Sequence, residues 1–555
     1  MLRVTEIKLP LITSAETGHT DAEIRAALVK KLAINTADIV SFTIFKRGAD
    51  ARKSHAILFV YSLDVVVNGE AKLLAKLAKD PHVKPTPDTE YKFVATAPSP
   101  QPSPKLGEGV KTKPRPIIVG FGPAGIFAAL ILAQAGFKPI VLERGKAVRE
   151  RTKDTFSFWR KSELNTESNV QFGEGGAGTF SDGKLWSQIK DPKHYGRKVL
   201  QEFVAAGAPP EILYVSHPHI GTFRLVGMVE TMREAIIKLG GEIRFESRVD
   251  DIEITNEQVQ GLTLQTGERI TTNHLILAVG HSARDTFEMI HRKNIYIEAK
   301  PFSIGFRIEH PQSLIDKARY GSSYSENLLS KLGSAEYKLV HHASNGRSVY
   351  SFCMCPGGTV VASASEAGCV VTNGMSQYSR NERNANAGIV VGITPEVDFP
   401  AHPLAGMHLQ RELEAKAYAL GGNTYAAPGQ LIGDFLANML STKFGEVQPS
   451  YTPGVHLTNL ETALPEFAIA AIREAIPEFA KQVKGYDLAD GILTGVETRT
   501  SSPIRIKRDD ETLESINTKG LYPCGEGAGY AGGILSAGVD GIRVAEAVSL
   551  SIINS

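Results

Sequence analysis

The chain has 555 residues, too many for one hydrophobic core, and its 42% hydrophobic and 22% charged residues are typical of a globular protein. The 61 Lys and Arg residues nearly balance the 60 Asp and Glu residues, so the whole chain is not a dedicated polyanion binder. Four cysteines exclude a disulfide scaffold. The first residues show no signal-peptide pattern and no apolar run has membrane length, so we expect a cytoplasmic protein without a transmembrane segment.

Residues 1–95 are expected to form a separate α+β domain. Strand and helix patterns alternate there in the order βαββαβ, which predicts a ferredoxin-like fold. Thr20 and Glu23 have the spacing of a capping box at the start of the first helix. The expected strands cover residues 3–10, 40–44, 56–67 and 91–94, and the expected helices begin near Asp21 and Leu73.

Residues 96–115 are predicted to be a linker because prolines alternate there with Ser, Gly and Lys. The first 115 residues carry 18 Lys and Arg against 12 Asp and Glu. This mildly basic region leaves two interpretations open. It is either an ordinary solvated surface or a docking site for an acidic partner such as nucleic acid.

A dinucleotide-binding pattern begins after the linker. A short apolar strand is followed by Gly120-Phe121-Gly122-Pro123-Ala124-Gly125 and an apolar helix, and a second strand ends at Glu143. A GxGxxG sequence between a strand and a helix, with an acid about 20 residues further on, predicts a bound dinucleotide. The expected nucleotide-binding residues of this segment are Gly120, Gly122, Pro123, Ala124, Gly125, Glu143 and Arg144.

Each position in this pattern has a physical reason. Gly120 allows a tight turn, Gly122 lets the backbone approach a pyrophosphate, and Gly125 lets the helix pack close to the sheet. The helix N-terminus then faces the phosphates. Glu143 would accept hydrogen bonds from both hydroxyls of an adenosine ribose, and its charge disfavours the 2′-phosphate of NADP.

Later segments complete a pattern that resembles the FAD-binding fold of the glutathione-reductase type. A strand near Val249 opens a β-meander, a buried strand ends at Gly280, and a C-terminal strand leads through Gly525 and Glu526 into another glycine-rich helix start. The resemblance implies noncovalent FAD in a Rossmann-like domain made of residues 116–300 and 491–555. Residues 301–490 would be an inserted mixed α/β substrate domain.

The resemblance also implies roles for single residues. It places Val249 beside the adenine, Gly280 in a turn against the cofactor, and Glu526 on the ribityl chain. The helix that begins at Gly532-Gly533-Ile534 would direct its N-terminus at the flavin pyrimidine, where a reduced flavin carries negative charge. Gly533 would therefore need to lack a side chain. A second Gly-rich loop, with Gly178 and Thr179, would lie against the pyrophosphate or the isoalloxazine ring.

The chain as a whole resembles a bacterial family known only as FAD-dependent dehydrogenases. The matching stretches are GEGGAGTFSDGKL from Gly173, HPHIGTFRL from His217, AVGHSARD from Ala278, FCMCPGG from Phe352 and ETRTSSPIRI from Glu497. The family implies a FAD-dependent oxidoreductase but does not supply the substrate.

Polar residues outside the nucleotide pattern are candidates for chemistry. Five of them would bind an anionic substrate or move a proton: His217, His219, His281, Arg284 and Arg499. Cys353 and Cys355 are interpreted as structural thiols, because a disulfide between residues i and i+2 is strained. We expect no metal site, since no Cys and His residues have ligand spacing. No second GxGxxG lies between an expected strand and an expected helix, so a nicotinamide would bind only transiently at the flavin, or another electron donor would serve.

The sequence therefore predicts an enzyme that transfers hydride or electrons through FAD to or from a small, anionic molecule. Two alternatives stay open. One is a flavin-dependent enzyme that modifies RNA and docks through its basic N-terminal domain. The other is a flavin-containing redox sensor without turnover.

Overall fold

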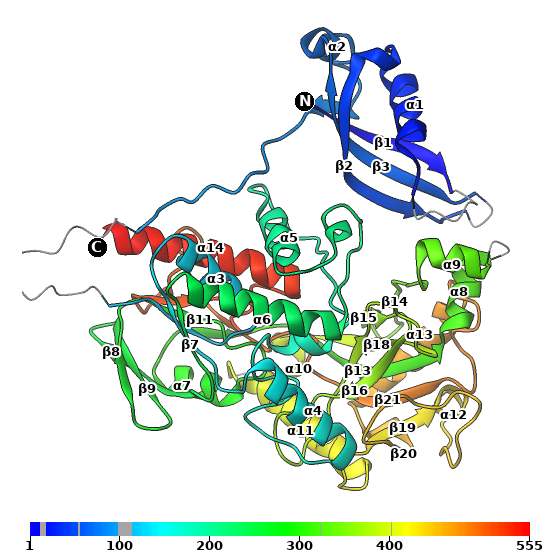
Figure 1. Ribbon diagram of the computed structural model, residues 1–555. Coiled ribbons are helices and arrows are strands. Elements are labelled where there is room, and N and C mark those ends of the chain that lie inside the picture. Colours follow the sequence, from blue (N-terminus) through cyan, green and yellow to red (C-terminus); the bar gives the residue numbers. More distant parts are fainter. Residues whose placement is uncertain (12–17, 54–55, 98–113, 322–323, 401, 555) are drawn as a thin grey trace, which may run out of the picture.

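The computed structural model shows a mixed α/β protein and describes all residues except 12–17, 54–55, 98–113, 322–323, 401 and 555. In Figure 1 the N-terminal part, in blue, stands beside a larger body. That body contains a parallel sheet with its helices and an inserted part coloured green to orange. The predicted linker at 96–115 lies almost entirely outside the described residues.

The N-terminal part is a four-stranded antiparallel sheet with two helices, and its strands lie in the order β2-β3-β1-β4. Ile24, Leu28 and Leu32 of α1 are fully buried in its core. The predicted capping box is confirmed, since Glu23 N donates to Thr20 Oγ1 at 3.3 Å and Thr20 N donates to the Glu23 carboxylate at 2.8 Å. The elements are β1 (Leu2–Pro10), α1 (Asp21–Leu32), β2 (Ile39–Asp50), β3 (Leu58–Val67), α2 (Glu70–Lys76) and β4 (Val83–Pro85).

The strand expected at 91–94 is wrong, because the fourth strand is β4, which pairs with β1. The aromatic residues that suggested a strand pack elsewhere. The ring of Tyr91 lies 6.1 Å from that of Tyr195 on α5 (Tyr195–Ala205), and Ala97 N donates to Ala135 O at 2.7 Å. Tyr91 and Ala97 therefore contact the larger body and do not belong to the N-terminal sheet.

The N-terminal part docks on the body through the edge strand β2. Arg47 N donates to Tyr214 O at 2.6 Å, and Ser216 N donates to Arg47 O at 2.8 Å. The Arg47 guanidinium also lies 5.3 Å from the centre of the Tyr214 ring. Strand β2 therefore contacts residues 214–216, which directly precede the candidate residue His217.

A five-stranded parallel sheet, in the order β23-β11-β5-β6-β7, forms the centre of the body. Helices α3, α5, α6 and α14 share one apolar core on one face, and the meander β8-β9-β10 and helix α7 contribute to a second core on the other. The strands are β5 (Ile117–Val119), β6 (Ile140–Leu142), β7 (Glu242–Arg244), β8 (Val249–Thr255), β9 (Gln258–Leu264), β10 (Arg269–Thr271), β11 (Leu275–Leu277) and β23 (Leu521–Pro523). The helices are α3 (Pro123–Gln134), α4 (Val148–Lys161), α6 (Thr222–Lys238), α7 (Arg284–Arg292) and α14 (Ile534–Asn554).

The order of the parallel strands reverses at β5, which has β6 on one side and β11 on the other. Ligands bind at such a point, beyond the carboxyl ends of the strands. The Gly120 loop follows β5, Glu143 follows β6, and Gly280 comes shortly after β11. The topology thus brings the predicted nucleotide-binding residues to one edge of the sheet.

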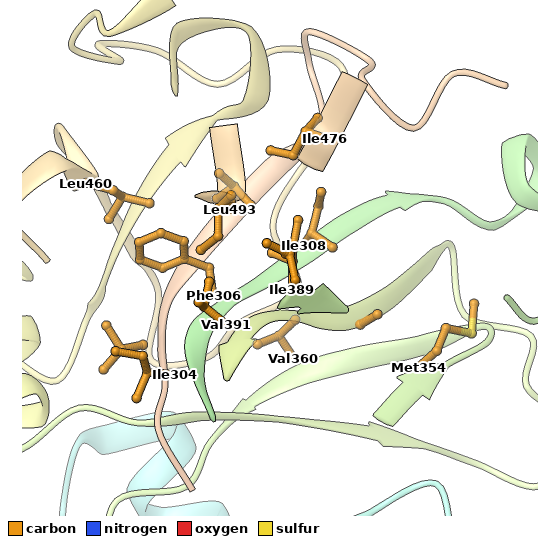
Figure 2. Packing of buried hydrophobic residues seen from close by; sticks show 14 of the residues in the cluster. Ile304, Phe306, Ile308, Met354, Val360, Ile389, Val391, Leu460, Ile476 and Leu493 are labelled. Atoms are coloured by element: carbon orange, nitrogen blue, oxygen red, sulfur yellow. The ribbon is translucent and has the colours of Figure 1, made fainter. Parts of the chain in front are cut away.

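The inserted part is built on a seven-stranded sheet in the order β14-β15-β18-β13-β21-β19-β20. Figure 2 shows its core, in which Phe306 of β13 and Val391 of β18 pack with Leu493 of β21, and Ile476 of α13 is also part of the cluster. The strands are β13 (Phe302–Pro311), β14 (Val340–His342), β15 (Ser348–Cys355), β16 (Gly358–Ala362), β17 (Thr372–Ser376), β18 (Asn384–Ile393), β19 (Ala427–Leu431), β20 (Val455–Leu457) and β21 (Ile492–Glu497). The short strands β12 (Ile297–Ala299) and β22 (Ile504–Ile506) pair with each other, and their isoleucines belong to the second core of the parallel-sheet body. The helices are α8 (Gln312–Tyr320), α9 (Glu326–Leu332), α10 (Pro395–Asp398), α11 (Ala405–Leu420), α12 (Ile432–Ala437) and α13 (Glu466–Ala480).

Among the described residues, none of the helices combines the length and the apolar character that crossing a bilayer requires.

Candidate functional site

A cavity of about 840 Å³ lies between the carboxyl edge of the parallel sheet and the inserted part. Its volume falls within the range of about 300–1,000 Å³ that is common for ligand sites. Its wall includes the glycine loop at 120–124, the second loop at 176–178, and residues from β15, β17 and β21 of the inserted sheet. One space therefore joins the nucleotide pattern to the inserted part.

The first glycine loop has the close backbone packing that its spacing predicts. Gly120 has φ +99°, and a Cβ there would come within 2.3 Å of Ala278 O. A Cβ at Gly125 would lie 2.0 Å from Gly120 O, so this glycine packs the helix on the strand and does not line the cavity. Gly122, Pro123 and Ala124 do line it.

The second glycine loop lies directly against the first. Gly176 has φ +60°, and a Cβ there would come within 2.9 Å of the Cα of Gly122. Gly178 lines the cavity as expected, but Thr179 does not. The Thr179 side chain is buried, and its Oγ1 accepts a hydrogen bond from Arg151 Nη1 at 3.4 Å. The structure thus assigns Thr179 to the support of the loop.

Glu143 is buried at the cavity wall, and its carboxylate already accepts three backbone hydrogen bonds. Gly145 N and Gly173 N donate to Oε1, each at 2.9 Å, and Phe121 N donates to Oε2 at 2.8 Å. A carboxylate has about four lone-pair positions. The expected acceptance of two ribose hydroxyls is therefore reduced to about one, and Glu143 also holds both glycine loops together.

Three further predicted positions, Arg144, Val249 and Gly280, line the cavity. Arg144 forms ion pairs with Glu167 at 3.0 Å and Asp285 at 2.8 Å. The resemblance to the FAD-binding fold implies that Val249 lies beside the adenine and that Gly280 lies in a turn against the cofactor.

The segment between β23 and α14 forms another part of the wall, through Glu526, Gly532, Gly533 and Ile534. Gly525 does not line the cavity. A Cβ there would lie 2.6 Å from Ala124 Cβ, so its role is close packing against α3. Burial raises the pKa of Glu526 to about 7, and Ser502 N donates to its Oε1 at 3.1 Å.

The backbone conformation of Gly533 does not itself require glycine. Its φ is not positive, and a Cβ at this position would meet no atom within 4 Å. A side chain there would enter the cavity without strain on the backbone. The need for glycine at 533 can therefore come only from what occupies the cavity.

Three of the five candidate catalytic residues line the cavity, namely His217, His281 and Arg499. His217 Nδ1 lies 2.7 Å from the Glu336 carboxylate, and the His217 ring stacks on Trp186 at 4.5 Å. Burial and the charges of Arg499 and Arg284 lower the pKa of His281 to about 4, so this imidazole is neutral near pH 7.

The other two candidates lie outside the lining. His219 Nε2 lies 3.0 Å from Tyr378 O, and its ring stacks on that tyrosine at 5.3 Å. Arg284 is buried and donates to Glu414 at 2.7 Å. His219 Nε2 and both Nη groups of Arg284 already have protein partners, so these side chains pack within the protein and do not line the cavity.

Several polar residues of the cavity wall were not among the positions predicted from the sequence, and they come from the inserted part and its neighbours. Lys184 follows the second glycine loop, and its Nζ donates to Met354 O. Its place at the end of GEGGAGTFSDGK was a usable signal. The others are Gln171, Trp186, Arg319, Glu336, Lys338, Tyr350, Asn373 and Glu497, most of which become neighbours only through the fold. Cys353, which the sequence indicated only as a structural thiol, also lines the cavity.

The cavity has the features that a dinucleotide cofactor requires. Its wall offers glycine positions where a Cβ would fill space, a buried carboxylate at the end of the second strand, and a helix start at Gly532–Ile534. These residues therefore fit FAD.

A protein of Clostridium beijerinckii described as uncharacterized is 48% identical over 520 residues, and the match covers 94% of each chain. Residues 301–500 match the sequence model of a family described as "FAD-dependent protein, C-terminal domain-like". The chain belongs to this family of FAD-dependent proteins. Its cofactor is FAD. Residues 1–66 match a domain of unknown function, DUF8436.

Solved structures similar to this FAD-dependent protein include CtdE in complex with FAD, with 12% identity and a TM-score of 0.30 over 79% of this chain and 84% of the other. The brominase Bmp2 has 11% identity and a TM-score of 0.36 over 80% of both chains. L-proline dehydrogenase from P. horikoshii has 12% identity and a TM-score of 0.32 over 79% of this chain and 94% of the other. Similarity at this level says nothing about the reaction.

Behind the cavity wall of this FAD-dependent protein, Glu366, Cys369 and Glu414 bring three possible metal ligands within 4.8 Å of one another. Arginines already neutralise both carboxylates. Arg284 and Arg499 pair with Glu414, and Arg411 pairs with Glu366 at 2.7 Å. These fixed positive charges would repel a metal cation, and the cluster is best described as an ion-pair network.

Proposed function

We propose that the protein is a FAD-dependent oxidoreductase that transfers hydride or electrons to or from a small, anionic molecule. The observation that carries the proposal is the shared cavity. The same cavity is lined by residues of the dinucleotide-binding pattern and by polar side chains that belong to the inserted part or face it, such as Lys184, Arg499 and His217. It therefore offers adjoining positions for a cofactor and for a second molecule.

The protein's own residues would bind and orient the reactants. Glu143 and the two glycine loops would hold the adenosine and pyrophosphate, and Glu526 would contact the ribityl chain. Lys184 is a cation at the wall with limited exposure, which suits an anionic substrate. The pair His217–Glu336 can hold a proton at His217 Nδ1. Bound FAD would supply the two-electron chemistry.

We also propose the finer assignment of the fold. The parallel order β7-β6-β5-β11-β23 with the meander β8-β9-β10 supports a FAD domain of the glutathione-reductase type. The βαββαβ succession and the order β2-β3-β1-β4 support a ferredoxin-like N-terminal domain.

The proposal is tested by anaerobic reduction of the purified, FAD-loaded protein with NADH, NADPH or dithionite. Small carboxylates, phosphates and disulfides are then screened for reoxidation of the flavin. We expect at least one anionic compound to reoxidise it catalytically. If no compound is turned over while the flavin cycles freely with chemical reagents, the protein is a redox sensor and the proposal is wrong.

Lys184→Gln should then raise the KM for the anionic substrate by about tenfold or more, because it removes a positive charge from the cavity wall. Lys190→Gln is the matched control, since Lys190 lies on the same segment but is exposed and outside the cavity lining. Steady-state kinetics of the two variants make the comparison. Equal KM values in both variants would show that Lys184 does not bind the substrate.

A further inference from the structure

Cys353 and Cys355 lie at an irregularity of strand β15. Phe352 pairs with Gly388 and Cys355 pairs with Asn386 on β18, so residues 353 and 354 form a β-bulge. Cys353 has φ +42°, a region that residues other than glycine rarely adopt. Bulges of this kind often turn a side chain toward a functional site. Here Cys353 lines the cavity and Cys355 is buried behind it.

Cations surround this bulge from two elements. Arg307 of β13 donates from Nη1 to Cys353 O at 2.9 Å, and Lys184 donates from Nζ to Met354 O. Acids lie close to both cations. Glu497 of β21 pairs with Arg307 at 2.9 Å, and Asp182 pairs with Arg380 and lies 3.8 Å from Lys184 Nζ.

The same surroundings distinguish the two thiols. The neighbouring Cys355 thiol and the charges of Lys184 and Arg307 hold the pKa of Cys353 well below its usual range, against burial and Asp182. The neighbouring Cys353 and burial raise the pKa of Cys355. These surroundings favour deprotonation of Cys353 at the cavity wall over deprotonation of Cys355, whose Sγ donates to Cys353 O at 3.3 Å.

We propose that Cys353 is the nucleophilic thiol of the cavity, that Cys355 is its resolving thiol, and that the substrate class is a small disulfide. The Cys353 thiolate attacks one sulfur of R–S–S–R, which forms a mixed disulfide and releases RS⁻. Cys355 then loses its proton to solvent and attacks the sulfur of Cys353, which forms the Cys353–Cys355 disulfide and releases the second RS⁻. The substrate gains two electrons and the two thiols lose them.

The strain of an i,i+2 disulfide, which argues against a structural bridge, suits a pair that cycles, because strained disulfides are reduced more readily. Resetting the pair needs two electrons and two protons, a reduction that FAD-dependent chemistry can supply. The inference rests on the proposed function only for this reset. A failure of this inference can be distinguished from a failure of the proposed function, because the thiol reactions are measured without turnover of the flavin.

The test uses the full-length, FAD-loaded protein with reduced thiols and the anionic aromatic disulfide 5,5′-dithiobis(2-nitrobenzoate). We expect a fast release of two equivalents of thionitrobenzoate per chain, with no label left on the protein. Cys355→Ser should release one equivalent and keep one label on Cys353, and Cys353→Ser should lose the fast phase. At pH 7 the fast phase should be about tenfold faster than reaction of an ordinary thiol, because thiolate is the reactive form.

Cys369→Ser is the control, since Cys369 is buried and should leave the fast phase unchanged. Mass spectrometry of the wild-type protein after brief alkylation locates the reactive thiol without any variant, so the test does not depend on the folding of Cys353→Ser. The proposal is overturned if Cys353 is not the first thiol labelled. It is also overturned if Cys355→Ser still releases two equivalents in the fast phase.

Discussion

Replacing Glu143 with alanine is expected to abolish FAD retention and to destabilise the cofactor side of the protein. The change removes the acceptor of three backbone N–H groups, those of Phe121, Gly145 and Gly173. Each buried donor left without a partner costs about 1–3 kcal/mol. Both glycine loops lose their common anchor, so we expect less than about a tenth of the wild-type FAD content.

The measurement is the ratio of flavin to protein absorbance after purification, together with the thermal midpoint. Glu143→Gln keeps one carbonyl acceptor and should give an intermediate FAD content. Glu150→Ala removes an exposed glutamate on α4 and should change neither quantity. Full FAD content in Glu143→Ala would contradict the role assigned to this carboxylate.

The second large effect is expected at Glu414, the buried acid of the ion-pair network. Its carboxylate accepts from Arg284 at 2.7 Å, from Arg499 at 2.7 Å and from Thr498 Oγ1 at 2.8 Å. Glu414→Ala leaves two cations without this partner, which costs about 3–5 kcal/mol when a buried pair is broken. We expect the thermal midpoint to fall by roughly 5–10 °C.

Glu412→Ala, on the same helix but exposed, is the matched control and should leave the midpoint within about 1–2 °C of the wild type. The network also predicts a pH dependence. The charges of Arg284 and Arg499 outweigh burial and lower the pKa of Glu414 from 4.5 to about 2 in the folded protein. Its contribution is therefore complete above about pH 4.5 and is lost as the pH falls toward 2. The difference between wild type and Glu414→Ala should shrink over this window, and a difference that stays constant would contradict the assignment.

The nucleotide-binding residues that follow β5 and β6 could be predicted because the sequence signals for them are local. Gly120, Gly125 and Glu143 lie within 24 residues, and their spacing reflects a strand–turn–helix–strand unit that folds in the same way in many contexts. The sequence could not show that Glu143 has three backbone partners, since one of them, Gly173, comes from a distant loop.

The part of the cavity wall that the inserted part forms or faces could not be predicted, because it depends on contacts between segments that are distant in sequence. Lys184 and Met354 are 170 residues apart in sequence. Cys353 reaches the cavity wall through a β-bulge, and no residue pattern in FCMCPGG marks that bulge. Tyr91 misled the prediction of a strand for the same reason, because its packing partner Tyr195 lies in another part of the chain.

The central claim is that FAD fills the cavity and that its flavin end lies against the start of α14. The FAD dissociation constant of Gly533→Val tests this most directly, with Gly392→Val on β18 as the control. A Cβ at either position meets no protein atom within 4 Å, but only Gly533 lines the cavity. We predict that Gly533→Val binds FAD at least about tenfold more weakly than the wild type, and that Gly392→Val binds it normally. A wild-type dissociation constant for Gly533→Val would contradict the placement of FAD in this cavity.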